Sequence, residues 1–203
     1  GLVGSEMCIR DRYVGDEKGF LLESRGEGKT NFSIMGKRPM AVLKGNDELE
    51  IMENGSVKYV KGRILEGVRD YIKSINITDE NNLPFTGGAV GVVGYDIIRQ
   101  YEKIPDENKE VVNTPVVHLM VFDEFIIYDH LHDRIKLVVL AECRDKANKI
   151  LDRMEREVKS SVPSEHYAVK EPSQIKFISN MTKEKYENIA VSYTHLRAHE
   201  TDQ

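Results

Sequence analysis

The sequence predicts an α+β fold made of mostly antiparallel sheet layers with flanking helices. Three observations support this class. Short runs of alternating or β-branched residues are separated by turn residues, as in antiparallel strands. One Asn-Gly pair stands between two such runs and indicates a tight hairpin. Two longer stretches repeat their apolar residues every three or four positions, as amphipathic helices do.

The first part of the chain is predicted to consist of strands. The turns between them contain glycine or proline, and Asn54-Gly55 joins the last two strands because both residues tolerate a positive φ angle. The strands predicted here are Phe20–Ser24, Asn31–Met35, Met40–Lys44, Leu49–Met52 and Val57–Val60.

The hydrophobic period changes after this part. Apolar residues from Ile64 to Ile75 fall on one helical face, which predicts a helix. Residues 87–94 are apolar and rich in glycine, which predicts a buried strand with close backbone approach. Tyr95–Glu102 is predicted to be a short helix that stops before Pro105.

Two strands and two helices are predicted in the remainder. Val116–Tyr128 and Arg134–Ala141 are β-branched runs joined in a hairpin. Cys143–Ser160 has the pattern of an amphipathic helix. Thr182 is predicted to cap a further helix that the carboxy-terminal tail cuts off.

Composition narrows the class of protein. The chain has 203 residues, of which 40% are hydrophobic and 31% are charged, so it can bury a core. A net charge of −5 argues against a nucleic-acid partner or a membrane surface, and the apolar runs are too short to cross a bilayer. Two cysteines do not make a disulfide framework, and we expect Cys143 to be a packing residue. This balance predicts a soluble cytoplasmic protein.

The two ends of the sequence have no structural pattern, but they are related through DNA. One DNA string can encode residues 2–12, and its reverse complement can encode residues 191–200. The string resembles a transposon-end sequencing adapter. We therefore expect residues 1–12 and 191–203 to be translated adapter sequence, and they are excluded from the fold prediction.

Two motifs invite a chemical role, and a structural interpretation is favoured for both. The glycine repeat at residues 88–94 lacks the spacing of a phosphate-binding loop. The other motif has metal-ligand side chains but lies in a predicted hairpin, which needs polar residues, without a remote ligand signature. Its members are Asp129, His130, His132 and Asp133. Spacing alone therefore indicates no metal site and no catalytic set.

Three stretches read together resemble anthranilate synthase component I, the chorismate-using subunit of tryptophan biosynthesis. Residues 20–36 contain FLLES and NFSIMG, similar to the family's FLLES and RYSFIG. Residues 83–105 contain PFTGGAVG, GYD and YEKIP, similar to PFTGGAVGYFGYD and YEKLP. Residues 179–186 read SNMTKEKY, similar to SNFTKEEY. The order and spacing of the three stretches agree with the family pattern.

The resemblance implies a domain layout within the anthranilate synthase component I fold. Residues 13–175 would form its amino-terminal, tryptophan-binding domain, and residues 176–190 would begin the chorismate-binding domain. The family's Mg²⁺ ligands and catalytic residues lie in that second domain. We therefore expect no catalytic residue and no bound metal in this chain, and no activity from it alone. A glutamine amidotransferase subunit is the expected partner of the intact enzyme.

The resemblance also implies a site for the feedback inhibitor L-tryptophan. The LLES strand binds the inhibitor in this family, which assigns Leu22, Glu23 and Ser24 to the site, with Ser33 as a neighbour. Glu23 can meet the ammonium group, and the Ser24 hydroxyl or a nearby backbone N–H can meet the carboxylate. Apolar neighbours would cover the indole. From the residues alone, a Glu-Ser pair that caps a turn is the alternative.

Two other functions stay open. Aminodeoxychorismate synthase component I, which serves folate synthesis, shares the fold and can carry a similar first strand. A stand-alone amino-acid-binding module without catalysis is the second alternative. The LLES and PFTGGAVG stretches together favour the tryptophan branch.

Overall fold

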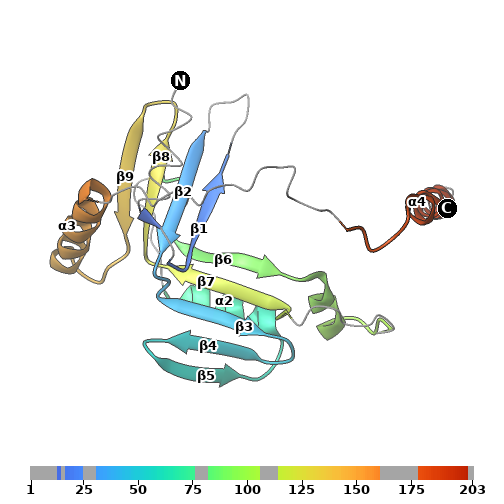
Figure 1. Cartoon of the computed structure of the whole chain (residues 1–203). Coiled ribbons are helices and arrows are strands. Elements are labelled where there is room, and N and C mark those ends of the chain that lie inside the picture. Colours follow the sequence, from blue (N-terminus) through green and yellow to red (C-terminus); the bar gives the residue numbers. More distant parts are fainter. Residues whose placement is uncertain are drawn as a thin grey trace. The chain divides into compact units, whose positions relative to one another are not determined.

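The computed structural model divides the chain into two compact units, Gly1–Ser164 and Glu165–Gln203. Among the described residues, the first unit holds two β-sheets, helices α2 and α3 and a 3₁₀ helix, and the second holds helix α4 (Figure 1). The structure describes residues 13–14, 17–24, 31–75, 82–105, 114–160 and 178–200.

A four-stranded antiparallel sheet contains the LLES strand. Its strands follow the order β1-β2-β8-β9, so β1 is an edge strand with one neighbour in the sheet. The strands are β1 (Gly19–Glu23), β2 (Phe32–Lys37), β8 (Glu124–Asp129) and β9 (Arg134–Val139).

A five-stranded antiparallel sheet forms the rest of the β-structure described. Its order is β5-β4-β3-β7-β6, and Figure 1 shows its strands crossing the direction of the four-stranded sheet. The strands are β3 (Ala41–Gly45), β4 (Leu49–Glu53), β5 (Ser56–Val60), β6 (Gly88–Val93) and β7 (Val117–Phe122). Mostly antiparallel sheets with flanking helices confirm the predicted α+β class.

The chain passes between the two sheets at two neighbouring bends. One bend, at Arg38, joins β2 to β3, and the other, at Asp123, joins β7 to β8. The prediction of one continuous run over Val116–Tyr128 is therefore wrong at Asp123. The local pattern is strand-like on both sides of the bend, and long-range bonds fix the bend itself. The Met40 N–H donates to the Val121 carbonyl, and Arg38 has a positive φ of 58°.

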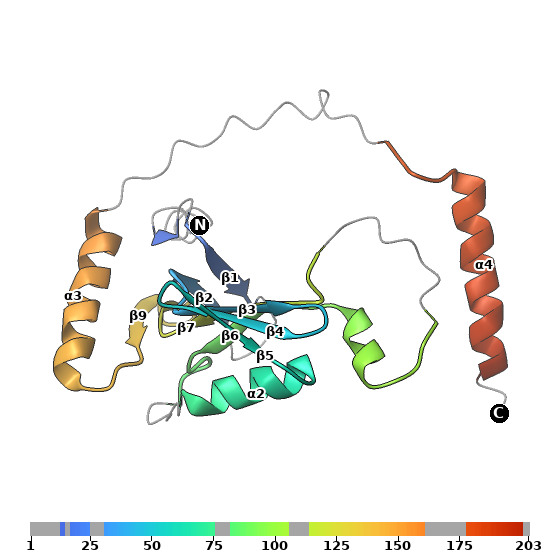
Figure 2. The same cartoon turned by 90° about the horizontal axis from the view of Figure 1, so that it is seen from below.

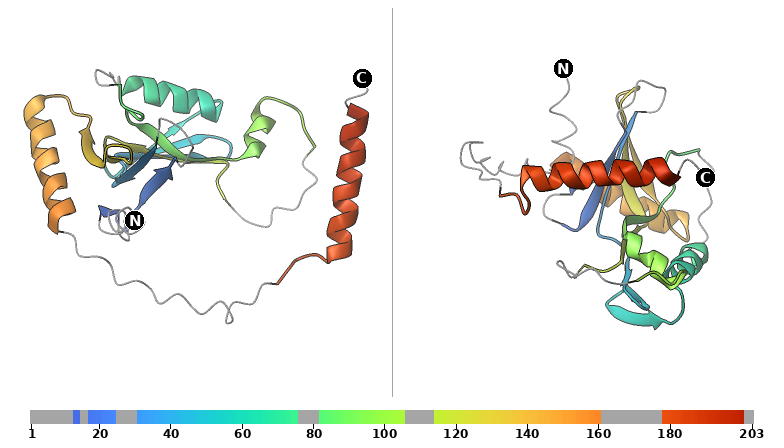
Figure 3. Two further views of the ribbon diagram at one scale, coloured as in Figure 1. Left: turned by 90° about the horizontal axis from the view of Figure 1, so that it is seen from above. Right: turned by 90° about the vertical axis from the view of Figure 1, so that its right-hand side faces the viewer.

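Helix α2 (Ile64–Ser74) covers one face of the five-stranded sheet, as Figures 2 and 3 show. Ile64 is fully buried. The helical face predicted from the sequence is confirmed, because its apolar side chains pack on buried strand residues. The helix contributes Leu65, Val68, Tyr71 and Ile72, and the sheet contributes Ala41, Leu43, Leu49, Ile51, Val117, Leu119 and Val121.

Helix α3 (Arg144–Ser160) packs on the four-stranded sheet, which confirms the second predicted amphipathic helix. Its Met154 is fully buried against Met35 and Ile126. The opposite face of this sheet joins an aromatic cluster. The rings of Phe20 and Phe122 lie 4.7 Å apart, and the cluster also contains Phe85 and Phe125.

Both predicted hairpins are confirmed. Asn54 and Gly55 have φ angles of 49° and 75°, the left-handed geometry that an Asn-Gly turn supplies at low cost. The second hairpin joins β8 to β9, and Asp133 adopts a positive φ of 50° just before β9 begins.

Strand β6 differs from the prediction of a buried strand. It is an edge strand, and Val92 and Val93 are 65% and 46% exposed. The predicted close approach is confirmed at Gly91, where an added Cβ would lie 2.1 Å from the His118 carbonyl oxygen. The short helix that follows is the 3₁₀ helix η1 (Tyr95–Gln100), and it ends before Pro105 as predicted.

Cys143 is exposed, so the prediction of a packing residue is wrong. Its carbonyl accepts a hydrogen bond from the Ala147 N–H at 3.1 Å, which places Cys143 at the start of α3. A residue at that boundary lies before the apolar face that covers the sheet.

Helix α4 (Lys183–Glu200) begins as predicted, because the Lys185 N–H donates to the Thr182 hydroxyl at 3.2 Å. It does not end at residue 190, since residues 191–200 contain no glycine or proline to interrupt it. The predicted domain boundary at residue 175 lies outside the described residues, and the origin of the two tails stays a prediction. Within the described residues, no helix is both long enough and apolar enough to span a membrane.

Candidate functional site

The predicted site residues lie at the open edge of the four-stranded sheet. Leu22, Glu23 and Ser24 are exposed, while Ser33 on the neighbouring strand is 1% exposed. The Ser24 N–H donates to the Phe32 carbonyl at 3.0 Å, so β1 stays paired with β2 to its end. The edge therefore combines an accessible carboxylate with a buried hydroxyl one strand away.

Strand register separates these four residues into two pairs. Glu23 and Ser33 are directly opposite each other in the antiparallel ladder, so their side chains share one face of the sheet. Leu22 and Ser24 alternate with Glu23 and belong to the other face. A ligand that contacts all four side chains must therefore reach around β1, which its edge position permits.

One face of the sheet carries three rows of side chains across its strands. The middle row is apolar and contains Met35 and Ile126, which α3 covers. A row at one end contains Glu23, Ser33 and Tyr128 in register. The row at the opposite end contains Lys37 on β2 and, by the same alternation, Glu124 on β8.

Ser33 is held by a histidine that the sequence analysis did not assign to the site. The Ser33 Oγ lies 2.8 Å from Nε2 of His130 in the β8–β9 hairpin. The His130 ring stands edge-on to the Tyr128 ring, with centroids 4.7 Å apart. The His130 N–H also donates to the Asn31 carbonyl at 3.0 Å, which ties the hairpin to the start of β2.

Asp129 organises the turn that carries His130. Its Oδ1 accepts the Leu131 and His132 N–H groups at 3.1 Å each, and its Oδ2 lies 2.9 Å from His132 Nδ1. The hydrogen bond from His132 lowers the pKa of the Asp129 carboxyl. Asp133 accepts a hydrogen bond from the Tyr128 hydroxyl at 2.5 Å. These bonds give the polar residues structural roles within the hairpin.

Within the described ranges, no group of three or more His, Cys, Asp or Glu residues is arranged to hold a metal ion. Of the four candidate ligands of the hairpin, Asp129 and His132 bond to each other. His130 bonds to Ser33, and Asp133 bonds to Tyr128.

An ion-pair network joins α3 to the row that contains Lys37 and Glu124. Arg38 donates to both carboxylate oxygens of Glu157, with distances of 3.0 and 2.8 Å, and its Nη2 lies 3.2 Å from Glu124 Oε1. Arg153 of α3 also pairs with Glu124, and Lys37 lies 3.1 Å from Glu157. The charges at this end of the sheet thus attach α3 to β2 and β8.

Burial and pairing compete within this network. Burial alone would raise the pKa of Glu157, but hydrogen bonds from Arg38 and Lys37 outweigh it and hold that pKa below its ordinary value. Tyr13 lies beneath Lys37, whose Nζ is 4.6 Å from the ring centroid. Burial raises the pKa of the Tyr13 hydroxyl. The charged side chains of this network pair with one another, as they do in a structural ion-pair network.

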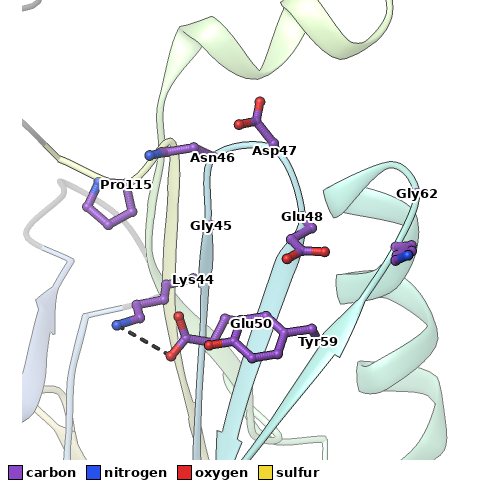
Figure 4. Close-up of a pocket in the computed structure, with 10 residues that line it drawn as sticks. Lys44, Gly45, Asn46, Asp47, Glu48, Glu50, Tyr59, Gly62 and Pro115 are labelled. Atoms are coloured by element: carbon purple, nitrogen blue, oxygen red, sulfur yellow. Dashed lines mark ion pairs between the residues drawn. The ribbon is translucent and has the colours of Figure 1, made fainter.

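A separate hollow of about 650 Å³ lies at the β3–β4 turn of the five-stranded sheet (Figure 4). Lys44 reaches Glu50 at 3.5 Å, with Tyr59 beside them, and Asp47 lies on the turn above. None of the sequence-predicted site residues lines this hollow. The predicted site and the hollow therefore belong to different sheets.

The sequence profile of the family described as chorismate binding enzyme matches residues 17–203. The chain belongs to this family. Among named relatives, anthranilate synthase component 1 of Acetivibrio thermocellus is 40% identical over 128 residues, which are 59% of this chain and 25% of that protein. The Aquifex aeolicus protein of the same name is 31% identical over 190 residues, covering 85% of this chain and 38% of that protein.

This member of the chorismate binding enzyme family is also similar to relatives with a second name, aminodeoxychorismate synthase component 1. Aminodeoxychorismate synthase component 1 of Bacillus subtilis is 30% identical over 120 residues, which are 58% of this chain and 25% of that protein. The crystal structure of anthranilate synthase component I from Streptococcus pneumoniae superposes with a TM-score of 0.61 at 23% identity, covering 86% of this chain and 40% of that one. That likeness concerns the fold.

The chain spans 25 to 40% of the length of these relatives. It is thus similar to part of anthranilate synthase component I, and the resemblance to that family is confirmed. The four site residues are a separate matter, and their assignment to an inhibitor site stays a prediction.

Proposed function

We propose that this chain is the L-tryptophan-binding regulatory part of an anthranilate synthase component I. The observation that carries the proposal is the LLES strand, which forms an exposed edge directly beside the buried Ser33. Family membership supports the proposal, because chorismate binding enzymes include anthranilate synthase component 1 among the relatives of this chain.

The chemistry of the edge suits a free α-amino acid. Glu23 offers an accessible carboxylate for the ammonium group. The Ser24 backbone N–H is already bonded to Phe32, so the Ser24 hydroxyl is the donor offered to the ligand carboxylate. Leu22 is 46% exposed and provides an apolar surface for the indole.

The proposed mechanism is allosteric. L-Tryptophan would favour one domain arrangement in which a distant chorismate site works poorly, and such coupling is typically about 1–3 kcal/mol. Mg²⁺ and the catalytic residues would belong to the chorismate-binding part of the intact enzyme, and a glutamine amidotransferase subunit would supply ammonia. The chain alone would then make no anthranilate from chorismate and ammonia. An assay of anthranilate fluorescence tests this, and measurable turnover refutes it.

Binding can be tested without background because the chain contains no tryptophan residue. Emission from L-tryptophan should change as the chain is titrated in, with weak affinity, and L-leucine should not compete. Glu23→Gln should weaken binding about tenfold, since it removes the charge that meets the ammonium. Equal affinity of Glu23→Gln and the wild-type chain would remove Glu23 from the site.

The folate branch is the second candidate, supported by the match to aminodeoxychorismate synthase component 1 of Bacillus subtilis. Analysis of the product made by the enzyme that the intact gene encodes separates the two branches, because one yields anthranilate and the other aminodeoxychorismate. A non-catalytic amino-acid-binding module is the third candidate function. The reading frame beyond residue 190 in the source genome decides it, since a chorismate-binding continuation excludes a stand-alone module.

A further inference from the structure

Beyond the four residues assigned above, the polar end of the sheet contains a fifth group with a fixed position. Ser33 is 1% exposed, so its hydroxyl needs a partner inside the protein, and the His130 Nε2 atom at 2.8 Å provides it. Because Glu23 faces Ser33 across the ladder, His130 acts on the same face as the proposed ammonium partner.

Besides the bond to Ser33, a backbone hydrogen bond and a ring contact hold His130 in place. Its backbone N–H is bonded to Asn31, and its ring stands at 83° to the Tyr128 ring. The Tyr128 hydroxyl is in turn bonded to Asp133 in the same hairpin. The imidazole is thus held between β2 and β8 and is not an exposed side chain free to turn away.

We propose that His130 is a positioning residue of the amino-acid-binding site, acting through the Ser33 hydroxyl. A hydroxyl has one hydrogen to donate and can also accept. Either tautomer of His130 can therefore hold the buried Ser33 hydroxyl, and this bond anchors β2 at the residue that pairs with Glu23. His130 therefore fixes the place at which the Glu23 carboxylate meets the ammonium group of an α-amino acid. This inference rests on the proposed function.

The hairpin itself offers a matched control. His132 lies two residues further on, is 58% exposed at its side chain and bonds to Asp129 instead of Ser33. Replacing either histidine changes the same turn by the same chemistry. Only His130 is bonded to the strand that faces Glu23.

The experiment titrates the full chain and four variants into L-tryptophan, with ligand fluorescence as the readout. His130→Leu should weaken binding about tenfold, because it leaves the Ser33 hydroxyl without its partner. His130→Gln should restore most of the affinity, since an amide can donate or accept at the same place, and His132→Leu should bind like the wild type. Glu23→Gln reports on the site itself.

A second measurement uses only the wild-type chain, so it does not require that a variant folds. Ring signals of the histidines in the wild-type chain, followed by NMR during titration, should shift for His130 and stay in place for His132. Different outcomes would overturn the positioning role of His130 and the binding site itself. If Glu23→Gln weakens binding but His130→Leu and the His130 ring signal do not respond, the positioning role is overturned and the site stands. If the wild-type chain does not bind L-tryptophan, both are overturned.

Discussion

The two ends of the four-stranded sheet use polar residues in different ways. At one end, Lys37 and Glu124 are buried and engaged by charged residues of α3. At the other end, Glu23 is exposed on an edge strand beside the buried Ser33. Both ends lie on the same face and flank the same apolar row. The comparison shows that charge alone does not mark a binding site, because Lys37 and Glu124 are hidden from solvent whereas the Glu23 side chain can be reached from it.

The largest difference between the ends should appear in stability. Glu124→Ala should lower the free energy of unfolding by about 3 kcal/mol, because it removes the buried partner of Arg38 and Arg153. Glu23→Ala should change it by less than about 0.5 kcal/mol, as expected for an exposed side chain. Urea unfolding measures both. Equal losses would mean that Glu23 is also a structural residue.

A smaller loss of stability is expected from a change at Ser33, the buried residue of the binding end. Ser33→Ala removes the hydrogen bond to His130 and should cost about 1 kcal/mol, between the values for the other two variants. The same unfolding measurement applies. A loss as large as that of Glu124→Ala would make the Ser33–His130 pair part of the core framework.

Acid should act mainly on the ion-pair end. The pKa of Glu157 is held below its ordinary value of 4.5 in the folded chain, so its contribution is complete above that value and is lost as pH falls through the folded pKa. Glu157→Gln should therefore reduce the loss of thermal stability below about pH 4.5. Melting curves across this range test the prediction, and an unchanged acid profile would assign acid sensitivity to other carboxylates.

One variant, Glu23→Gln, should have the smallest effect on stability and the largest effect on ligand binding. Glu23→Gln should leave the melting temperature nearly unchanged while it weakens L-tryptophan binding. Differential scanning fluorimetry with and without the ligand makes both comparisons in one experiment. A variant that melts earlier but binds normally would reverse the roles assigned to the two ends.

Much of the fold could be predicted because local pattern and tertiary packing agree. The Asn54-Gly55 turn and the apolar faces of α2 and α3 are set by short-range chemistry. The bend at Asp123 could not be found this way, because the strand pattern continues through it. The exposure of Val92 on β6 depends on which strands lie beside β6 in the sheet, and a glycine-rich apolar run does not encode that.

The candidate site also combines features that the sequence indicates with features that only the strand order reveals. A resemblance pointed to the LLES strand, but only the register shows that Glu23 and Ser33 share a face while Leu22 belongs to the other. His130 is 97 residues from Ser33, and its contact follows from the pairing of β2 with β8. A signal was present, since His130 lies two residues after Tyr128 at the end of a predicted strand. It could not be used without knowing the strand order.

The central claim is that L-tryptophan binds at the exposed end of β1 and not elsewhere on this chain. Amide hydrogen exchange followed by mass spectrometry, with and without saturating L-tryptophan, tests this directly, with L-leucine as the control ligand. We expect slower exchange in residues 19–24 and 31–35 and in the hairpin that carries His130, with no change around Arg38. Protection confined to the hollow at the β3–β4 turn, or no protection at all, would contradict it.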